Sequence, residues 1–271
     1  NANSWQRLTL ETEMHRALER GEFVLHYQPK IALGDGKIIG MEALLRWQSP
    51  ERGLVAPDEF IPILEKMGLI LPVGAWVIDT ACGQAAAWQK AGLTAAHVAV
   101  NLSVLQLKQP DFVDMVRDIL ARHNIDGDAT VLELELTESL LMKDLAGTTH
   151  ALNALREMGI RFSIDDFGTG YSCLSYLKHL PVNSLKIDQS FVLNLPESRE
   201  DTAIVDAVVA LGKGLGLKII AEGVETQEQL NYLQKIGCDE AQGFLFSRPV
   251  PAAEMTLLLQ CHEVSLLPCC F

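Results

Sequence analysis

The stretch Phe23–Trp47, which reads FVLHYQPKIALGDGKIIGMEALLRW, contains two largely apolar runs separated by the turn-forming residues Gly34–Gly36. Glycine and aspartate at such a break favour a tight turn, so we predict that Phe23–Leu33 and Ile38–Trp47 pair as an antiparallel hairpin. A hairpin of this kind opens the fold, and every later element has to be arranged around it.

Six further strand-like runs follow the hairpin, and helical patterns separate most of them. The strands are expected at His97–Ser103, Val131–Thr137, Arg161–Phe167, Ser184–Asp188, Lys218–Val224 and Glu240–Ser247. The helices between them are expected at Val73–Ala91, Phe112–His123, Leu145–Met158, Ala203–Leu211 and Gln227–Ile236. Long helical crossovers between short apolar strands predict parallel pairing. We therefore predict a TIM-like (β/α)8 barrel variant with an antiparallel first strand, and an open doubly wound sheet is the alternative.

The length of the chain fits one such domain. Single α/β barrels contain about 250 residues, and this chain has 271. We assign residues 1–21 to a lead helix or linker, 22–260 to the barrel and 261–271 to a C-terminal tail. Because the chain begins with Asn1 and not with methionine, we expect it to be part of a longer protein.

Composition excludes several classes of partner. The net charge is −13, from 22 basic and 35 acidic residues, so a basic face for duplex nucleic acid is not expected. The apolar stretch Leu69–Ile78 is shorter than the about 20 residues of a membrane span, and no signal peptide is visible. We expect a cytoplasmic domain without membrane contact, although the full-length protein could be membrane-tethered. None of the six cysteines forms a C-x-x-C pair, which argues against a zinc cage.

Polar side chains recur near the ends of the predicted strands, where barrel enzymes place their chemistry. They are Gln28, Glu42, Arg46, Asn101, Glu135, Asp165, Asp166, Lys186, Glu222 and Gln242. Clustered carboxylates repel one another unless some are protonated or a cation lies among them. Carboxylate and amide oxygens suit Mg²⁺ or Mn²⁺, and paired metals are a known device for phosphodiester cleavage. Any one of these acids could instead be a solvated residue or a helix cap, and Lys186 a surface salt bridge.

These residues lie in phrases that resemble one protein family. The phrases are Tyr27-Gln28-Pro29, Glu42-Ala43-Leu44, Asn101-Leu102-Ser103, Glu135-Leu136-Thr137-Glu138, Asp165-Asp166-Phe167-Gly168-Thr169-Gly170-Tyr171-Ser172, Leu185-Lys186-Ile187-Asp188, Ala221-Glu222-Gly223-Val224-Glu225 and Gln242-Gly243-Phe244. Together they resemble the EAL-domain phosphodiesterases of bacterial cyclic di-GMP signalling, from about Glu22 to Pro249. Cys173 stands where that family usually has serine, outside the expected ligand set.

The resemblance implies an activity and a cofactor. It implies hydrolysis of one phosphodiester bond of cyclic di-GMP to linear 5'-pGpG, which lowers this second messenger. It implies two divalent ions per site, Mg²⁺ or Mn²⁺, with Ca²⁺ expected to inhibit. By resemblance, one ion is held by Glu42, Asn101, Glu135 and Asp165. The other is held by Asp165 and Asp166, with Glu222 nearby or acting through water.

The resemblance also implies roles for the remaining residues. Lys186 would contact the attacking water, while Glu222 would be either the general base or the holder of a water molecule. Substrate contacts are expected from Gln28, Arg46, Gln242 and Glu225. Glu138 resembles the residue that anchors the loop after Asp166, and its alternative role is a helix cap. A homodimer and an upstream regulatory or cyclase-like domain are expected partners.

Two other functions remain open from the sequence. The chain could be a receptor that binds cyclic di-GMP without cutting it, although such relatives usually lack one of the acids or the lysine. It could also be a different metal-dependent barrel enzyme, for example one that forms an enolate with a lysine base. The phrase Glu42-Ala43-Leu44 and the loop glycines Gly168 and Gly170 count against the second alternative.

Overall fold

Eight strands close into a barrel in the computed structural model, which describes residues 2–93, 97–125, 131–138, 145–169, 177 and 179–261. The strands are β1 (Phe23–Ala32), β2 (Ile38–Ser49), β4 (His97–Asn101), β5 (Leu132–Thr137), β6 (Arg161–Phe167), β7 (Ser184–Ile187), β8 (Lys218–Ala221) and β9 (Glu240–Ala241). β1 pairs with β2 on one side and with β9 on the other, so the sheet has no gap between its first and last barrel strands. The predicted barrel is confirmed, and the open doubly wound sheet is wrong.

The first strand runs against both of its neighbours, as the hairpin predicted. Gln28 pairs with Glu42 across the β1–β2 ladder, and Ile31 pairs with Ala241 of β9. The pairs from β2 and β4 onward to β8 and β9 are all parallel. Two short strands extend this ring: β3 (Gly53–Val55) pairs with β2, and β10 (Val250–Pro251) pairs with β1.

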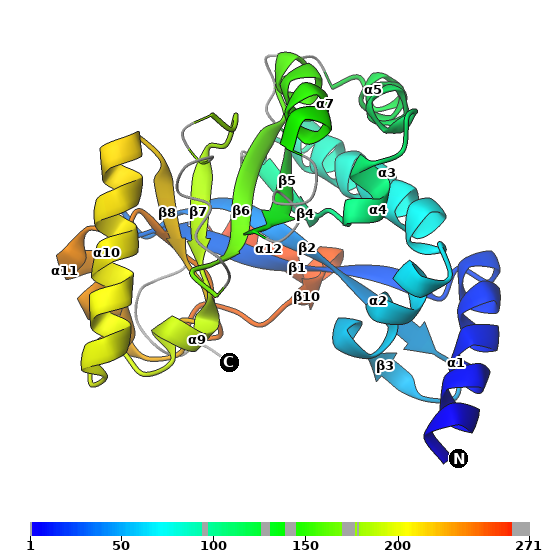
Figure 1. The fold of residues 1–271 in the computed structure, drawn as a ribbon, viewed down its shortest axis with the longest axis horizontal. Coiled ribbons are helices and arrows are strands. Elements are labelled where there is room, and N and C mark those ends of the chain that lie inside the picture. Colours follow the sequence, from blue (N-terminus) through cyan, green and yellow to red (C-terminus); the bar gives the residue numbers. More distant parts are fainter. Residues whose placement is uncertain are drawn as a thin grey trace.

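Helices surround the barrel (Figure 1). They are α1 (Ala2–Glu19), α2 (Pro57–Lys66), α3 (Ile70–Lys90), α4 (Val104–Leu107), α5 (Phe112–Arg122), α7 (Leu145–Glu157), α9 (Gln189–Val192), α10 (Arg199–Leu215), α11 (Gln227–Ile236) and α12 (Ala252–Gln260). The sequence did not predict β3, β10, α2, α4, α9 or α12, because each is short or contains proline. Strand β9 ends at Ala241 and not at Ser247, and just beyond it Gly243 lies so close to the backbone of Val224 that a Cβ there would clash.

The main core lies between the outer face of the barrel and the helices. Tyr27 of β1 meets Trp88 of α3 edge to face, with ring centroids 5.0 Å apart. The same helix also buries Val73, Val77 and Ala81. Among the described helices α3 is long and apolar enough to cross a membrane, but 44% of that apolar window is buried within the protein. We therefore interpret α3 as a core helix of the barrel.

The lead helix packs against the barrel domain through apolar residues. Leu10, Met14 and Ala17 of α1 are buried, and α1 lies beside α2 and β3, away from α10 and α11 (Figure 1). The predicted C-terminal tail, apart from Cys261, and loop residues 170–176, including Cys173, lie outside the described residues.

Candidate active site

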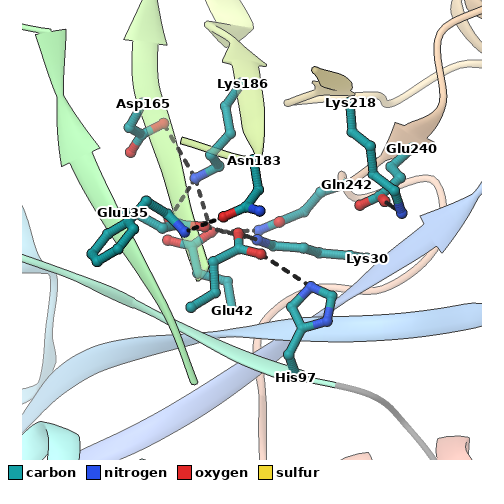
Figure 2. Close-up of polar contacts among 12 residues, drawn as sticks. Lys30, Glu42, His97, Glu135, Asp165, Asn183, Lys186, Lys218, Glu240 and Gln242 are labelled. Atoms are coloured by element: carbon teal, nitrogen blue, oxygen red, sulfur yellow. Dashed lines mark hydrogen bonds and ion pairs between the residues drawn. The ribbon is translucent and has the colours of Figure 1, made fainter. Parts of the chain in front are cut away.

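The polar side chains predicted at the strand ends converge inside one end of the barrel. Lys186 lies at the centre of this group because it alternates with Leu185 and Ile187, which face the helices and are fully buried. Its Nζ lies 2.5 Å from Glu135 Oε2, 2.6 Å from Glu222 Oε1 and 3.2 Å from Asp165 Oδ1. Glu42 Oε2 is 3.7 Å away. We call Lys186 and these four carboxylates the mouth cluster, part of which is shown in Figure 2.

The charges of the mouth cluster are unbalanced. Burial alone would lower the pKa of Lys186, but the surrounding carboxylates raise it well above its usual value. Burial raises the pKa of Glu42 to about 7 and that of Glu222 to about 8; the neighbouring carboxylates add to this effect, and Lys186 opposes it. For Glu135, the ammonium groups of Lys186 and Lys30 outweigh burial and lower the pKa. One ammonium therefore offsets only part of the carboxylate charge, and the oxygen-rich donor set fits additional cations.

The backbone at Asp165 and Asp166 departs from regular strand geometry, and this brings their side chains near each other. Consecutive strand residues normally point to opposite faces, but Asp166 has a φ of 55°, in the left-handed region. The β6–β7 register also shifts between Ile164 and Phe167. As a result, Asp165, Asp166 and Glu222 each offer a ligand oxygen within 4.8 Å of the others. A non-glycine residue in this conformation costs about 1–3 kcal/mol, and such strain is concentrated at functional sites.

Side-chain amides hold Glu42 in place. Asn101 Nδ2 donates to Glu42 Oε1 at 2.7 Å, and Gln242 Nε2 donates to Glu42 Oε2 at 2.7 Å. Gln242 Nε2 also lies 2.9 Å from Gln28 Oε1, and Gln28 Nε2 donates to the carbonyl oxygen of Ser247 at 3.0 Å. Four of the residues predicted for the site therefore form one hydrogen-bonded chain along the β9, β1, β2 and β4 side of the barrel.

Comparison with known proteins places this arrangement in a family. A model of the EAL domain matches residues 11–249 of the chain. The chain belongs to the EAL domain family. It is 48% identical over 255 residues to the bifunctional diguanylate cyclase/cyclic di-GMP phosphodiesterase MucR of Pseudomonas aeruginosa, covering 94% of this chain and 37% of MucR.

Two further relatives agree with this placement. The cyclic di-GMP phosphodiesterase NbdA of Pseudomonas aeruginosa is 42% identical over 263 residues, covering 97% of this chain and 33% of NbdA. The solved structure of the PaMucR phosphodiesterase in complex with c-di-GMP has a TM-score of 0.87 and 48% identity, and the match covers 91% of this chain and 99% of that one. The EAL domain described here spans about a third of the length of MucR and NbdA.

Two of the predicted substrate contacts lie at the edge of the EAL site. Arg46, which follows Glu42 on the same face of β2, is half-buried, and its Nη1 donates to the carbonyl oxygen of Leu45 at 2.9 Å. Glu225 is exposed, and its backbone N–H donates to Gln229 Oε1 at 2.7 Å. Within the described residues, the side chain of Glu225 makes no hydrogen bond or ion pair with the mouth cluster.

The predicted loop anchor, Glu138, lies directly after β5 and is buried. In the loop that it is expected to anchor, Thr169 donates its hydroxyl to the carbonyl oxygen of Asp166 at 2.8 Å. The next residues of this loop, 170–176, lie outside the described residues. The anchoring role of Glu138 therefore stays a prediction.

Four further polar residues, to which sequence reasoning assigned no role, lie next to the site. Asp188, two residues after Lys186, lies near Asp166; burial and the carboxylates of Asp165 and Asp188 raise the pKa of Asp166 to about 6. Deeper in the barrel lie the other three, Lys30, His97 and Glu133. Strand alternation places Lys30, His97 and Glu133 on the same face as predicted site residues, because each stands two or four residues from one of them, but it does not show which of them meet across the barrel.

Proposed function

We propose that this EAL domain hydrolyses one phosphodiester bond of cyclic di-GMP to linear 5'-pGpG, using two divalent cations. The observation that carries the proposal is the mouth cluster, in which four carboxylates surround a single ammonium group. Relatives that align with more than nine-tenths of the chain are named as phosphodiesterases for this nucleotide. All the residues expected for catalysis are present in the sequence.

The donor set supports a two-metal site. We propose that Glu42, Asn101, Glu135 and Asp165 hold one ion, and that Asp165 and Asp166 hold the other, with Glu222 beside it. The raised pKa values of Glu42, Asp166 and Glu222 reflect carboxylates pressed together in a buried space, and a cation would relieve that repulsion. Oxygen donors without sulfur or imidazole favour Mg²⁺ or Mn²⁺ over zinc.

The protein side chains position the nucleophile and the substrate. When bound, paired divalent ions lower the pKa of a water molecule and offset the charge of the phosphate. Lys186 Nζ faces the same carboxylates and is placed to donate to the attacking oxygen. Glu222 Oε1 lies 2.6 Å from that ammonium, so we assign it to holding the attacking water, with general-base action as the alternative.

Substrate recognition is proposed for the residues around this centre. The planar guanidinium of Arg46 suits a phosphate oxygen pair. Gln28 and Gln242, already joined by a hydrogen bond, face the same end of the barrel. Glu225 is exposed and free to reach a bound nucleotide.

A direct assay tests the proposal. Purified protein is incubated with cyclic di-GMP and Mg²⁺, and the products are separated by chromatography. We expect 5'-pGpG to accumulate, and we expect the matched variant Glu42→Gln to release none. Nucleotide that binds without being cut, at any Mg²⁺ or Mn²⁺ concentration, would overturn the enzyme and favour the receptor alternative.

The setting of the domain is also proposed. Because MucR and NbdA are about three times longer than the matched segment, we propose that this domain acts next to a regulatory or cyclase-like domain in the cytoplasm. We further propose a homodimer, which light scattering of the purified chain would test.

A further inference from the structure

A second buried lysine lies beneath the mouth cluster. The side chain of Lys30 on β1 is completely buried, and its Nζ lies 2.8 Å from both Glu133 Oε1 and Glu135 Oε1. The other oxygen of Glu133 lies 3.1 Å from His97 Nε2. We call Lys30, Glu133 and His97 the lower layer; in Figure 2 Lys30 and His97 enter the group from the side away from Asp165.

Glu135 connects the lower layer to the mouth cluster. Its Oε1 accepts a hydrogen bond from Lys30 at 2.8 Å, and its Oε2 accepts one from Lys186 at 2.5 Å. The two oxygens of a carboxylate are rigidly linked, so fixing one of them from below determines where the other points. We infer that Lys30 is a positioning residue: it orients the carboxylate of Glu135 and thereby sets the affinity of the site for divalent cations. The inference rests on the proposed function, which assigns Glu135 as a metal ligand.

The lower layer is built at a cost that folding alone does not explain. Burying an ammonium group is unfavourable even when it is paired, and apolar residues of similar volume are often as stable or more so. The barrel nevertheless makes room for this layer. Gly40 lies opposite Lys30 in the ladder, and a Cβ at Gly40 would lie 2.9 Å from the carbonyl oxygen of His97 and 3.1 Å from its Nε2. A glycine at this position therefore admits the imidazole that holds Glu133.

The test separates the effect of Lys30 on the orientation of Glu135 from its effect on the net charge of the barrel interior. In the double variant Lys30→Met/Glu133→Gln one positive and one negative charge are removed together, so the net charge of the barrel interior is unchanged. The amide introduced at position 133 can still hydrogen-bond His97, while Glu135 loses its lower hydrogen bond. We expect calorimetric titration with Mn²⁺, without nucleotide, to give a dissociation constant raised about 10–100-fold, the usual effect of losing support for a ligand.

The matched control is Glu133→Gln alone, in which Lys30 still holds Glu135. We expect its Mn²⁺ affinity to stay close to that of the wild type, and the Mn²⁺ concentration for half-maximal turnover to follow the dissociation constants across all three proteins. Thermal melting, followed by circular dichroism, fixes a titration temperature at which every variant is folded. A double variant that melts earlier yet binds Mn²⁺ like the wild type would reduce Lys30 to a structural role and overturn the inference.

A further variant distinguishes failure of the inference about Lys30 from failure of the proposed metal site. Glu135→Gln should lose Mn²⁺ affinity if Glu135 is a ligand at all. If the wild type and Glu135→Gln bind Mn²⁺ equally, the proposed metal site itself fails, and the inference about Lys30 fails with it. If Glu135→Gln loses affinity while the double variant does not, only the inference about Lys30 is wrong.

Discussion

The two buried lysines of the barrel have opposite surroundings. Lys30 in the lower layer lies between Glu133 and Glu135, and the second oxygen of Glu133 is held by His97. Lys186 in the mouth cluster faces four carboxylates. In the lower layer the ammonium of Lys30 offsets the charge of Glu133, whereas the mouth cluster has more negative charge than its one cation offsets.

This difference is visible in the pKa values of the acids. Burial would raise the pKa of Glu133, but Lys30 and His97 outweigh it and lower the pKa well below its usual value. In the mouth, by contrast, the pKa values of Glu42 and Glu222 rise to about 7 and about 8, because burial and neighbouring carboxylates outweigh Lys186. A buried charged cluster thus has two possible uses: a balanced one orders the interior, and an unbalanced one attracts a ligand of opposite charge.

The strongest expected effect comes from removing metal. Exhaustive chelation should abolish hydrolysis of cyclic di-GMP, because the mouth cluster then has only Lys186 to offset its carboxylates. Mg²⁺ or Mn²⁺ should restore turnover, while Ca²⁺ should support little, since it tolerates looser geometry. Hydrolysis is measured by release of 5'-pGpG, and activity that survives chelation would contradict the two-metal proposal.

A substitution in the mouth cluster should mainly lower turnover, whereas one in the lower layer should mainly lower stability. Asp165→Ala should lower turnover by about 1,000-fold or more, as the loss of a bridging ligand removes metal chemistry. Its metal-free melting temperature should hold or rise, since Lys186 keeps three other carboxylates. Glu133→Ala should instead destabilise the fold by about 3–5 kcal/mol, because it breaks a buried ion pair and leaves a cavity. Denaturant unfolding and turnover assays of both variants test this contrast. If both variants were destabilised equally, the mouth cluster and the lower layer would not differ in their contribution to stability.

Lys186→Ala separates a role on the nucleophile from a role in binding. We expect kcat to fall about 100–1,000-fold, the usual effect of losing one donor to a developing charge, with a smaller change in KM. Steady-state kinetics at saturating Mn²⁺ measure both values. A variant with unchanged kcat and a raised KM would reassign Lys186 to substrate binding.

Glu138→Ala tests whether support for the site extends beyond the barrel interior. If Glu138 anchors the loop after Asp166, turnover or metal affinity should fall about 10–100-fold while the protein stays folded. A helix cap predicts instead a stability loss of about 1 kcal/mol with turnover nearly intact. Melting temperature, Mn²⁺ titration and turnover of this one variant distinguish the two roles.

The smallest expected effect is a pH dependence of the Mn²⁺ affinity, which arises from the mouth cluster and not from the lower layer. Below a pKa of about 7, Glu42 holds a proton that must leave before a cation binds. Mn²⁺ affinity should therefore rise with pH, by about tenfold between pH 6 and pH 8. Glu133 stays ionised throughout this range, so Glu133→Gln should leave the slope unchanged. An affinity that is flat with pH would contradict the raised pKa values.

Much of the barrel and of its mouth could be predicted from the sequence, because both follow from local patterns. The two apolar runs and the turn at Gly34–Gly36 predicted the hairpin, and polar residues at strand ends predicted the mouth cluster. The lower layer was missed because a lysine such as Lys30, in an apolar strand, gives no sign of which buried acid it will meet across the barrel. The left-handed conformation of Asp166 was also missed, since it depends on the register shift beside β7.

The placement of β1 has a consequence for how the chain folds during synthesis. β1 can pair with β2 as soon as the hairpin is made, but its other edge pairs with β9 and β10, which are made near the end of the chain. Until then β1 presents an unpaired edge, the feature that promotes association between chains. Contacts between such distant segments also slow folding. A nascent chain that stalls before Glu240 would therefore leave this edge of β1 exposed. The edge is covered only when β9 and β10 have left the ribosome and paired with it.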